Sequence, residues 1–253
     1  MTLREFDFHF QELLGIPETS RADSSWNGVQ IECSDKPITR VACAVDACRA
    51  SAERAADLKA DLLFVHHGLF WGRPVAVTGT HYGRLKTFLD NDLALYAVHL
   101  PLDRHDTLGN NAVMAKKLGL EEISPFGEYH GVNIGWRGEL ASPKTMDEIA
   151  TTLFGGPDEL IGTLPFGPEE IRTVGIVSGG APYDVTQAID QGLDLYITGE
   201  AAHSVYHNCL EAGINVIFGG HYQTETFGVR AIAEYCQTTL SLESAFVELP
   251  TGL

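Results

Sequence analysis

The chain has 253 residues, of which 44% are apolar and 20% are charged. This apolar share is sufficient for a packed core and argues against disorder, and the length allows one large domain or two small ones. The formal net charge is −17, from 34 acidic and 17 basic side chains. Because a surface of this sign repels phosphates, nucleic acid is disfavoured as a partner unless part of the surface is locally basic.

Composition also bears on where the protein resides. No apolar run approaches the roughly 20 residues that span a bilayer, so no membrane association is expected. The N-terminus lacks the basic-then-apolar order of a signal peptide. The five cysteines form no CxxC pair, and their odd number argues against a complete set of disulfides. We therefore expect a cytoplasmic protein with reduced thiols.

Strands and helices alternate in the first half of the chain. Helical spacing of apolar residues, with Thr2 and Glu5 placed as a capping box, predicts a helix over residues 2–14. Strands are predicted over residues 29–31, 39–45, 62–65 and 93–98, and helices over residues 51–59, 81–89 and 110–118. This alternation is typical of an α/β fold with a largely parallel sheet.

The second half resumes the alternation after a change of pattern. The alternating pattern of residues 127–140 indicates a strand or hairpin. A second capping box at Thr145 and Glu148 begins a helix that extends to residue 154. Residues 160–168 form a connection interrupted by glycine and proline. Further strands are predicted over residues 173–177, 193–198 and 215–218, and helices over 184–191, 201–212 and 227–237. We expect α/β halves at residues 1–126 and 127–253, with the C-terminal helix free to pack back on the first half.

The two halves resemble each other in sequence. Residues 38–68 align without gaps with the segment that starts at Ile171, so that ADLLFVHH lies over LDLYITGE. Residues 99–103 and 221–225 both read His-x-x-x-carboxylate after a buried strand. Any two β-α-β segments share some similarity, but we favour an internal duplication, which predicts two similar halves with helices layered around mostly parallel or mixed sheets.

Polar residues that suit metal ions follow the buried strands. The stretch DLLFVHHGLFW at residues 61–71 delivers two adjacent histidines to a strand end, where α/β folds place ligand sites; the alternative is a capping and a core histidine. Imidazoles and carboxylates without thiolates suit zinc, iron, manganese or cobalt. The set exceeds the needs of one tetrahedral ion with an open position and suits two ions about 3.5–4 Å apart. Its members are His66, His67, His99, Asp103, Glu200, His221 and Glu225.

Several of these motifs resemble one known family. HHGLFW, HLPLDRHDTLGNNA, YITGE and GGHYQTETFG are similar to segments of the Nif-three-like (NGG-one-interacting factor three) family, whose bacterial members are often labelled GTP cyclohydrolase I type 2 homologues or dinuclear metal centre proteins. The resemblance implies two similar α/β halves, two divalent ions in the cleft between them, and a ring-shaped homohexamer. It implies these metal ligands: His66, His67, Asp103, His221 and, as the bridge between both ions, Glu225.

The chain departs from the family pattern beside two of these ligands. Tyr222 and Thr226 replace a histidine and an arginine, which puts any transferred substrate in doubt. His99 and Glu200 are expected to accept the other ring N–H of ligating histidines, although Glu200 could equally be a helix N-cap acid.

Two further motifs have simple alternatives. His203 and His207 lie four residues apart on a predicted helix, where surface placement is favoured over a third metal site. Residues 178–180, Ser-Gly-Gly, follow a strand and precede a helix, and either hold an anion with their N–H groups or form a plain tight turn.

Three functions agree with these observations. The favoured one is a metal-dependent hydrolase that uses a metal-activated water on a small-molecule substrate: on GTP, as the family label suggests, or on a phosphoester or amide. The alternatives are a non-catalytic protein that stores or delivers metal and a regulatory, DNA-associated ring, which the charge disfavours. Catalytic residues other than the metal ligands remain unassigned, with His99 and Glu200 as candidates.

Overall fold

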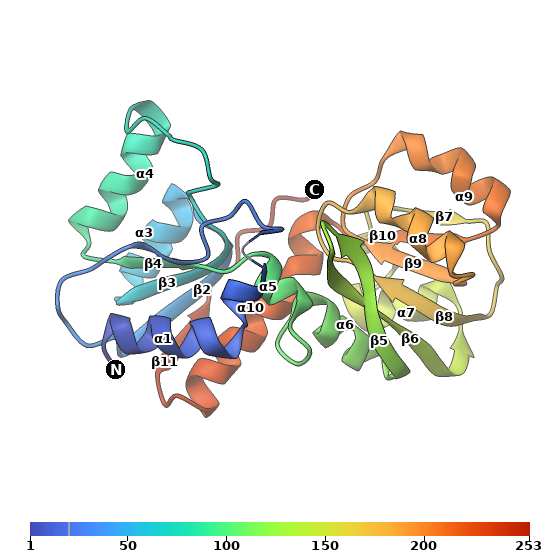
Figure 1. Cartoon of the computed structure of the whole chain (residues 1–253), viewed down its shortest axis with the longest axis horizontal. Helices are drawn as coiled ribbons and strands as arrows, with labels where there is room; N and C mark the ends of the chain where they lie inside the picture. Colours follow the sequence, from blue (N-terminus) through green and yellow to red (C-terminus); the bar gives the residue numbers. More distant parts are fainter. Residues whose placement is uncertain (20) are drawn as a thin grey trace. The chain divides into compact units, whose positions relative to one another are not determined.

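The computed structural model describes residues 1–19 and 21–253, which form two compact units, each with its own sheet (Figure 1). The first unit comprises Met1–Leu102 and Val229–Leu249, and the second comprises Asp103–Gly228 and Pro250–Leu253. The sequence placed the division between residues 126 and 127, whereas the second unit begins earlier. The predicted α/β class is confirmed. No helix among the described residues is long and apolar enough to cross a membrane.

The first unit contains a five-stranded, mostly parallel sheet. Its elements are α1 (Leu3–Leu13), α2 (Ile16–Thr19), β1 (Gly28–Ile31), β2 (Arg40–Asp46), α3 (Arg49–Asp57), β3 (Leu62–His67), α4 (Gly79–Asp90), β4 (Ala94–Ala97) and β11 (Glu243–Phe246). In the strand order β1-β4-β3-β2-β11, only β1 is antiparallel to its neighbour. Since the other strands run parallel, their carboxyl ends meet at one edge of the sheet, where β3 ends in two histidines.

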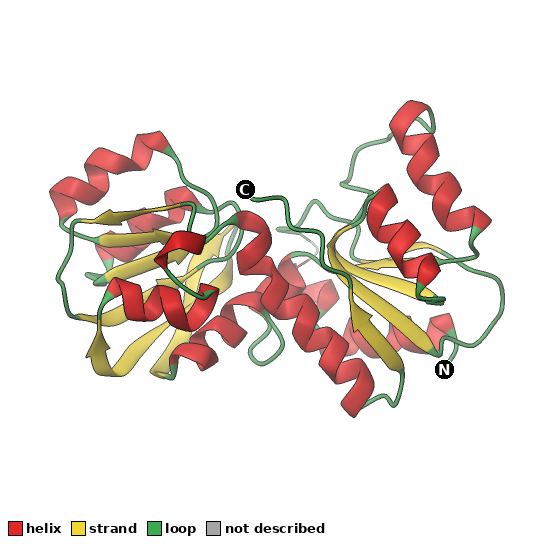
Figure 2. Ribbon diagram, turned by 180° about the vertical axis from the view of Figure 1, so that it is seen from behind, coloured by secondary structure: helices red, strands yellow, loops and turns green. Residues whose placement is uncertain are grey.

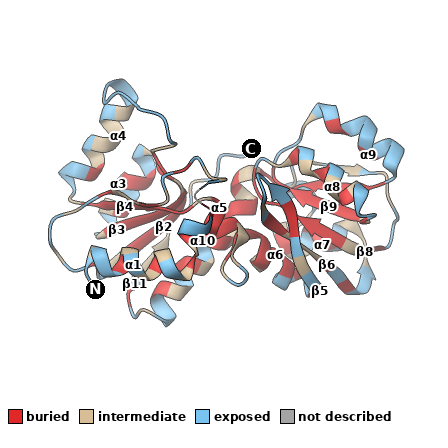
Figure 3. Ribbon diagram, in the orientation of Figure 1, coloured by how far each residue is buried: buried red, intermediate tan, exposed pale blue. Residues whose placement is uncertain are grey.

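Helices cover both faces of this sheet. Leu63 and Val65 of β3 pack in one apolar cluster with residues of α3 and α4. Phe64 points to the other face, where its ring centroid lies 5.5 Å from that of Phe10 in α1. Figure 3 shows β2, β3 and β4 as mostly buried, with exposed residues on helices α3 and α4. Burial on both faces explains why β3 reads as a continuous apolar run rather than an alternating one.

The second unit contains a six-stranded mixed sheet (Figure 2). Its elements are α6 (Asn110–Leu118), β5 (Leu120–Tyr129), β6 (Val132–Lys144), α7 (Met146–Phe154), η1 (Pro157–Glu159), β7 (Gly162–Pro165), β8 (Ile171–Ile176), η2 (Pro182–Asp184), α8 (Val185–Asp190), β9 (Leu195–Thr198), η3 (His203–Val205), α9 (Tyr206–Ala212) and β10 (Asn215–Phe218). In the order β5-β6-β8-β9-β10-β7, the three strands β8, β9 and β10 are parallel and the remaining pairs are antiparallel.

The core of the second unit lies between this sheet and two helices. Ile176, Ile197 and Ile217, from the three parallel strands, share one apolar cluster with Leu118 of α6 and Leu153 of α7. Two further helices belong to both units by sequence: α5 (Leu100–Arg104) crosses the division, and α10 (His221–Thr238) contributes its first eight residues to the second unit and the rest to the first.

The parallel strands of the two sheets pair in the same register. Val41 of β2 is opposite Leu62 of β3, and Val174 of β8 is opposite Leu195 of β9. The differences 174 − 41 and 195 − 62 are both 133, which is the offset at which the two sequence segments align. This shared register supports the internal repeat, and common ancestry of the halves stays a prediction.

In each of these strand pairs, one carboxylate accepts backbone hydrogen bonds from the start of the neighbouring strand. Asp61 Oδ2 accepts hydrogen bonds from the backbone N–H groups of Thr39 and Arg40 at 2.9 and 3.0 Å. Asp194 Oδ2 accepts from the N–H groups of Arg172 and Thr173 at 2.9 and 2.8 Å. The acid before each central strand therefore fixes the start of the strand beside it.

The repeat does not extend unchanged to the two His-x-x-x-carboxylate motifs. Leu62 pairs with Ala94, and its counterpart Leu195 pairs with Asn215, so the offset for these strands is 215 − 94 = 121. The two histidines differ by 221 − 99 = 122. His99 and His221 are therefore one residue out of register, and His221 begins a helix whereas His99 directly precedes one.

Some predicted elements differ from those observed. The hairpin expected over residues 127–140 is longer than predicted, because β5 already starts at Leu120, just after α6. The turn between β5 and β6 places His130 and Gly131 at φ 50° and 82°, and a two-residue hairpin turn requires such positive φ angles. The helix expected over residues 201–212 is a 3₁₀ turn followed by α9, and strand β7 lies within the expected connection at residues 160–168. Strand β11 was not predicted.

Replacing Asp61 with alanine should lower the free energy of unfolding by about 1–2 kcal/mol, because two backbone N–H groups lose a charged acceptor. Asp194→Ala should behave similarly, whereas Asp57→Ala, on the exposed side of α3, should change stability by less than about 0.5 kcal/mol. Chemical denaturation followed by circular dichroism measures these differences. Equal stability of the Asp61 and Asp57 variants would contradict the role given to Asp61.

The same variant should show a pH dependence. Burial raises the pKa of Asp61, but the hydrogen bonds from Thr39 and Arg40 and the charge of Lys36 outweigh this effect and lower it. A lowered pKa stabilises the fold above the unfolded pKa of about 3.9, and this stabilisation is lost as the pH falls through the folded pKa. The stability difference between wild type and Asp61→Ala should therefore be full at pH 7 and shrink in acid.

Candidate metal centre

His66 stands at the carboxyl end of β3 with its side chain fully buried. Its Nδ1 lies 3.0 Å from the carbonyl oxygen of Val98. A carbonyl can only accept, so Nδ1 carries the hydrogen, and in the neutral ring the lone pair is on Nε2. The backbone directly after β4 thus fixes the tautomer of this histidine.

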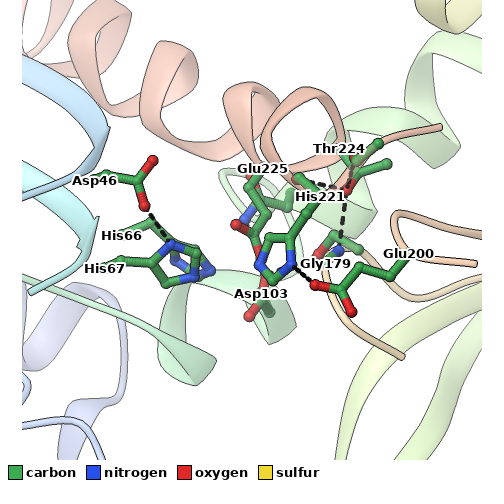
Figure 4. A network of polar contacts seen from close by, with 12 residues as sticks. Asp46, His66, His67, Asp103, Gly179, Glu200, His221, Thr224 and Glu225 are labelled. Carbon is green, nitrogen blue, oxygen red and sulfur yellow. Dashed lines mark hydrogen bonds and ion pairs between the residues drawn. The ribbon is translucent and has the colours of Figure 1, made fainter. Parts of the chain in front are cut away.

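His67 and His99 are held in the same way by carboxylates. Nδ1 of His67 lies 2.9 Å from Oδ1 of Asp46, at the end of β2 (Figure 4), and Nδ1 of His99 lies 2.9 Å from Oδ1 of Asp23. Each carboxylate accepts the Nδ1–H, so Nε2 is the ring nitrogen that could bind a metal ion. Carboxylate-bound imidazoles of this kind are common among metal-ligating histidines.

Three of the five imidazoles of the first unit lie together. Each of His66, His67 and His99 offers one ligand atom, and these atoms lie within 4.8 Å of one another. The sequence analysis expected His99 to accept the ring N–H of a ligating histidine. In the structure, Nδ1 of His99 is instead hydrogen-bonded to Asp23, and its ring packs beside the rings of His66 and His67.

Asp23 organises the loop around His99. Besides His99 Nδ1, its carboxylate accepts hydrogen bonds from the backbone N–H of Ser25, the side-chain amide of Asn27 and the backbone N–H of Leu100. Burial raises the pKa of Asp23, but the hydrogen bond and charge of His99, followed by Asn27 and Ser25, lower it below the usual value. A carboxylate buried in this way is ionised at neutral pH and suits an imidazole that donates to it.

The sequence analysis missed both carboxylates that orient the histidines. Asp46 had a usable signal, because it directly follows the strand predicted over residues 39–45, and in the structure it ends β2, the neighbour of the strand that carries the histidines. Asp23 lies in a loop, 76 residues before His99, and no spacing pattern marks it.

In the second unit, Asp103 is a buried carboxylate of α5, only 5% exposed. Its Oδ1 accepts hydrogen bonds from Asn110 Nδ2 and Ser178 Oγ, both at 2.9 Å. These donors are themselves fixed: Asn110 Oδ1 accepts the backbone N–H of Gly228, and Asn111 Oδ1 accepts that of Ser178. The orientation of Asp103 is therefore set by α6 and by the turn after β8.

His221 and Glu225 lie one turn apart at the start of α10. Nδ1 of His221 donates to Oε1 of Glu200 at 2.6 Å, and its Nε2 lies 3.1 Å from Oε1 of Glu225 (Figure 4). Burial lowers the pKa of His221, but the hydrogen bonds and charges of Glu225 and then Glu200 outweigh it and raise the pKa to about 9. An imidazole between two carboxylates is stabilised as a cation, so a bound metal ion would take the place of its Nε2 proton.

Glu200 Oε1 accepts the Nδ1–H of His221. Glu200 is not the N-cap of the next helical segment, because η3 begins at His203 with Ala202 as its cap, and its role behind a metal ligand stays a prediction.

Two glycines allow these side chains to approach the backbone. Gly179 has φ +68°, and a Cβ there would overlap Oε1 of Glu225. A Cβ at Gly199 would lie 2.7 Å from the carbonyl oxygen of Gly179 and 2.8 Å from the Cα of His221. The turn at residues 178–180 also uses its N–H groups internally, since Ser178 donates to Asn111 and Gly179 to Thr224. This favours the plain turn over an anion site.

The remaining residues considered in the sequence lie elsewhere. His203 and His207 are both exposed, as favoured. Tyr222, which stands where the family pattern has histidine, is 4% exposed, and Thr226 Oγ1 donates to the carbonyl oxygen of Gln223.

Comparisons with known proteins agree with the motifs. A family model described as Duf34/NIF3 (NGG1p interacting factor 3) matches residues 1–251. The chain is 44% identical to the GTP cyclohydrolase 1 type 2 homolog of Archaeoglobus fulgidus and 40% identical to that of Treponema pallidum, and both alignments cover all of each chain. The crystal structure of TTHA1606 from Thermus thermophilus is 37% identical over the whole of both chains, with a TM-score of 0.89.

The matched family model spans nearly the whole sequence, and the relatives are similar over their full length. The chain therefore belongs to the Duf34/NIF3 family.

Proposed function

We propose that this protein binds two divalent metal ions and acts as a metal-dependent hydrolase. The proposed ligands are His66, His67, Asp103, His221 and Glu225. The observation that carries the proposal is that each of the three histidines donates its Nδ1–H to a fixed protein acceptor: Val98, Asp46 and Glu200 respectively. Ligating histidines need such an acceptor for their other ring nitrogen.

The donor atoms within each unit fit divalent cations. The first unit supplies imidazoles, and the second supplies two buried carboxylates and an imidazole. This mixture suits zinc, iron, manganese or cobalt rather than an iron–sulfur cluster. Since Glu225 is 3% exposed and one of its oxygens lies beside His221 Nε2, a cation there would offset the burial of its charge.

The chain's own residues would position these ligands for hydrolysis. Asp46 and Glu200 hold the rings of His67 and His221, and Ser178 with Asn110 holds the carboxylate of Asp103. Bound divalent ions supply a Lewis acid and lower the pKa of water toward 7, which makes hydroxide available at neutral pH. Supports fixed on strands and helices reduce the reorganisation that the reaction requires.

The names of the relatives suggest GTP as the first substrate to test, because the two described above are called GTP cyclohydrolase 1 type 2 homolog. Phosphoesters suit the same two-metal chemistry and belong in the same panel.

Protein loaded with zinc or manganese and dialysed should contain about two ions per chain. His67→Ala and Glu225→Gln should each lower this number or weaken binding at least about tenfold, because each removes one donor. Inductively coupled plasma mass spectrometry and calorimetric titration measure content and affinity. His207→Ala, at an exposed position on α9, is the control and should bind as wild type does. Full metal content in both ligand variants would contradict the proposed set.

Turnover of GTP or of a phosphoester by the metal-loaded protein tests the hydrolase. Activity should be abolished by His67→Ala and Glu225→Gln and kept by His207→Ala. Hydrolysis that survives both ligand substitutions would show that the activity comes from another site or a contaminant.

Gly179→Ala should weaken metal binding at least about tenfold, because the added Cβ displaces the carboxylate of Glu225. Gly192→Ala is a matched control: Gly192 also has a positive φ, +65°, but a Cβ there meets nothing within 4 Å. Both variants should lose about 1–2 kcal/mol of stability from the left-handed backbone, and only Gly179→Ala should lose metal. Equal metal affinity in the two variants would contradict the contact.

A further inference from the structure

Trp26 is an aromatic residue that the first unit holds in place but leaves open to solvent. It is 62% exposed, although tryptophan is highly buried on average. Its ring stacks on that of Phe70, with the centroids 5.9 Å apart and the planes at 29°. Its backbone N–H donates to the carbonyl oxygen of Phe70 at 3.0 Å. Phe70 therefore supports the indole, and most of Trp26 remains accessible to another molecule.

The side-chain amide of Gln30 fastens Trp26 to the segment that follows β3. Its Nε2 donates to the carbonyl oxygen of Trp26 at 2.7 Å. Its Oε1 accepts the backbone N–H groups of Leu69 and Phe70 at 2.7 and 3.2 Å. A Cβ at Gly68 would overlap this amide, so a glycine at that position allows the close approach.

Asn27 anchors the loop on the other side of Trp26. Its Oδ1 accepts the backbone N–H of His99 at 2.7 Å, and its Nδ2 donates to Oδ2 of Asp23 at 2.9 Å. The backbone that carries the indole is thus bound at both ends. A contact residue that is already fixed loses little conformational entropy when a ligand binds, which favours binding.

The support of Trp26 is continuous with the candidate metal centre. Trp71 directly follows Phe70, and its ring centroid lies 5.9 Å from that of the proposed ligand His67 and 4.9 Å from that of His99. We call Trp26, Phe70 and Trp71 the aromatic surface; all three belong to the first unit. A substrate that reacts at an ion bound by His67 would lie beside this surface.

A flat heterocycle fits this surface better than other ligands do. Aromatic rings stack favourably with their centroids 4.5–7 Å apart, and nucleobases stack on tryptophan regardless of their sequence. Ser25, next to Trp26, is 7% exposed, and its Oγ has no hydrogen-bond partner among the described residues, so polar edge atoms of a heterocycle suit the place. The net charge of −17 disfavours a nucleic acid strand, which leaves a ligand of nucleoside size.

We propose that Trp26 stacks on a planar, nucleobase-like ring of the substrate and thereby selects which molecules reach the candidate metal centre. The inference rests on the proposed hydrolase for the reaction and names the class of its substrate. Trp26 contacts the ring and no reacting atom, so its role is specificity.

Calorimetric titration of the metal-loaded protein with adenosine, guanosine and ribose tests the contact. Wild type should bind both nucleosides and bind ribose, which lacks the base, at least about tenfold more weakly. Trp26→Ala should weaken nucleoside binding at least about tenfold, whereas Trp26→Phe should keep most of it because a ring remains. Phe8→Ala is the matched control, since Phe8 is an aromatic residue of the same unit and is 71% exposed.

Kinetics separate a stacking role from a structural one. Trp26→Ala should raise KM for adenosine monophosphate at least about tenfold with little change in kcat, and should change kcat/KM for glycerol phosphate, which has no ring, less than about twofold. Metal content, circular dichroism and sedimentation should match those of wild type.

Wild type that binds neither nucleoside, or equal nucleoside affinity in wild type and folded Trp26→Ala, would overturn the inference. A changed oligomeric state in Trp26→Ala would also overturn it, because the indole would then be a contact between copies of the chain. If wild type still binds two ions and hydrolyses a phosphoester in these cases, the proposed function stands. Nucleoside binding that depends on Trp26 without any hydrolysis would support the stacking contact and contradict the hydrolase.

Discussion

The candidate metal centre depends on one recurring hydrogen bond, from Nδ1 of a histidine to an acceptor that the backbone holds in place. His66 uses the carbonyl oxygen of Val98, and His67 and His221 use carboxylates. Each bond fixes a ring plane and leaves Nε2 as the nitrogen that would bind a metal ion in the proposed site. The sheets matter to the site because they place these acceptors at strand ends, within reach of the rings.

Much of this arrangement follows from local sequence. Apolar runs bounded by turn residues locate the parallel strands, and the histidines that directly follow one of them lie at its carboxyl end. The 133-residue offset between the halves also appears in the strand pairing of Val41 with Leu62 and of Val174 with Leu195. These features depend on periodicity and on contacts between neighbouring elements, which a single sequence records well.

Other features could not be predicted because they depend on contacts between distant residues. Asp23 lies in a loop without periodicity, and only the closed fold brings it to His99. The short strand β11 pairs with β2 across most of the chain, so its own four residues carry little signal. The one-residue difference between the His99 and His221 motifs likewise becomes visible only when the strand registers are compared.

The separation of Asp23 and His99 by 76 residues has a consequence for assembly. Contacts of high sequence separation carry a loop-closure cost and form late relative to local ones. The strand that ends in His66 and His67 can pair with its neighbours before the N-terminal loop docks, so the imidazoles of β3 are in place before His99 is aligned. Alignment of the His99 ring is thereby coupled to docking of the N-terminal loop, and so to completion of the first unit.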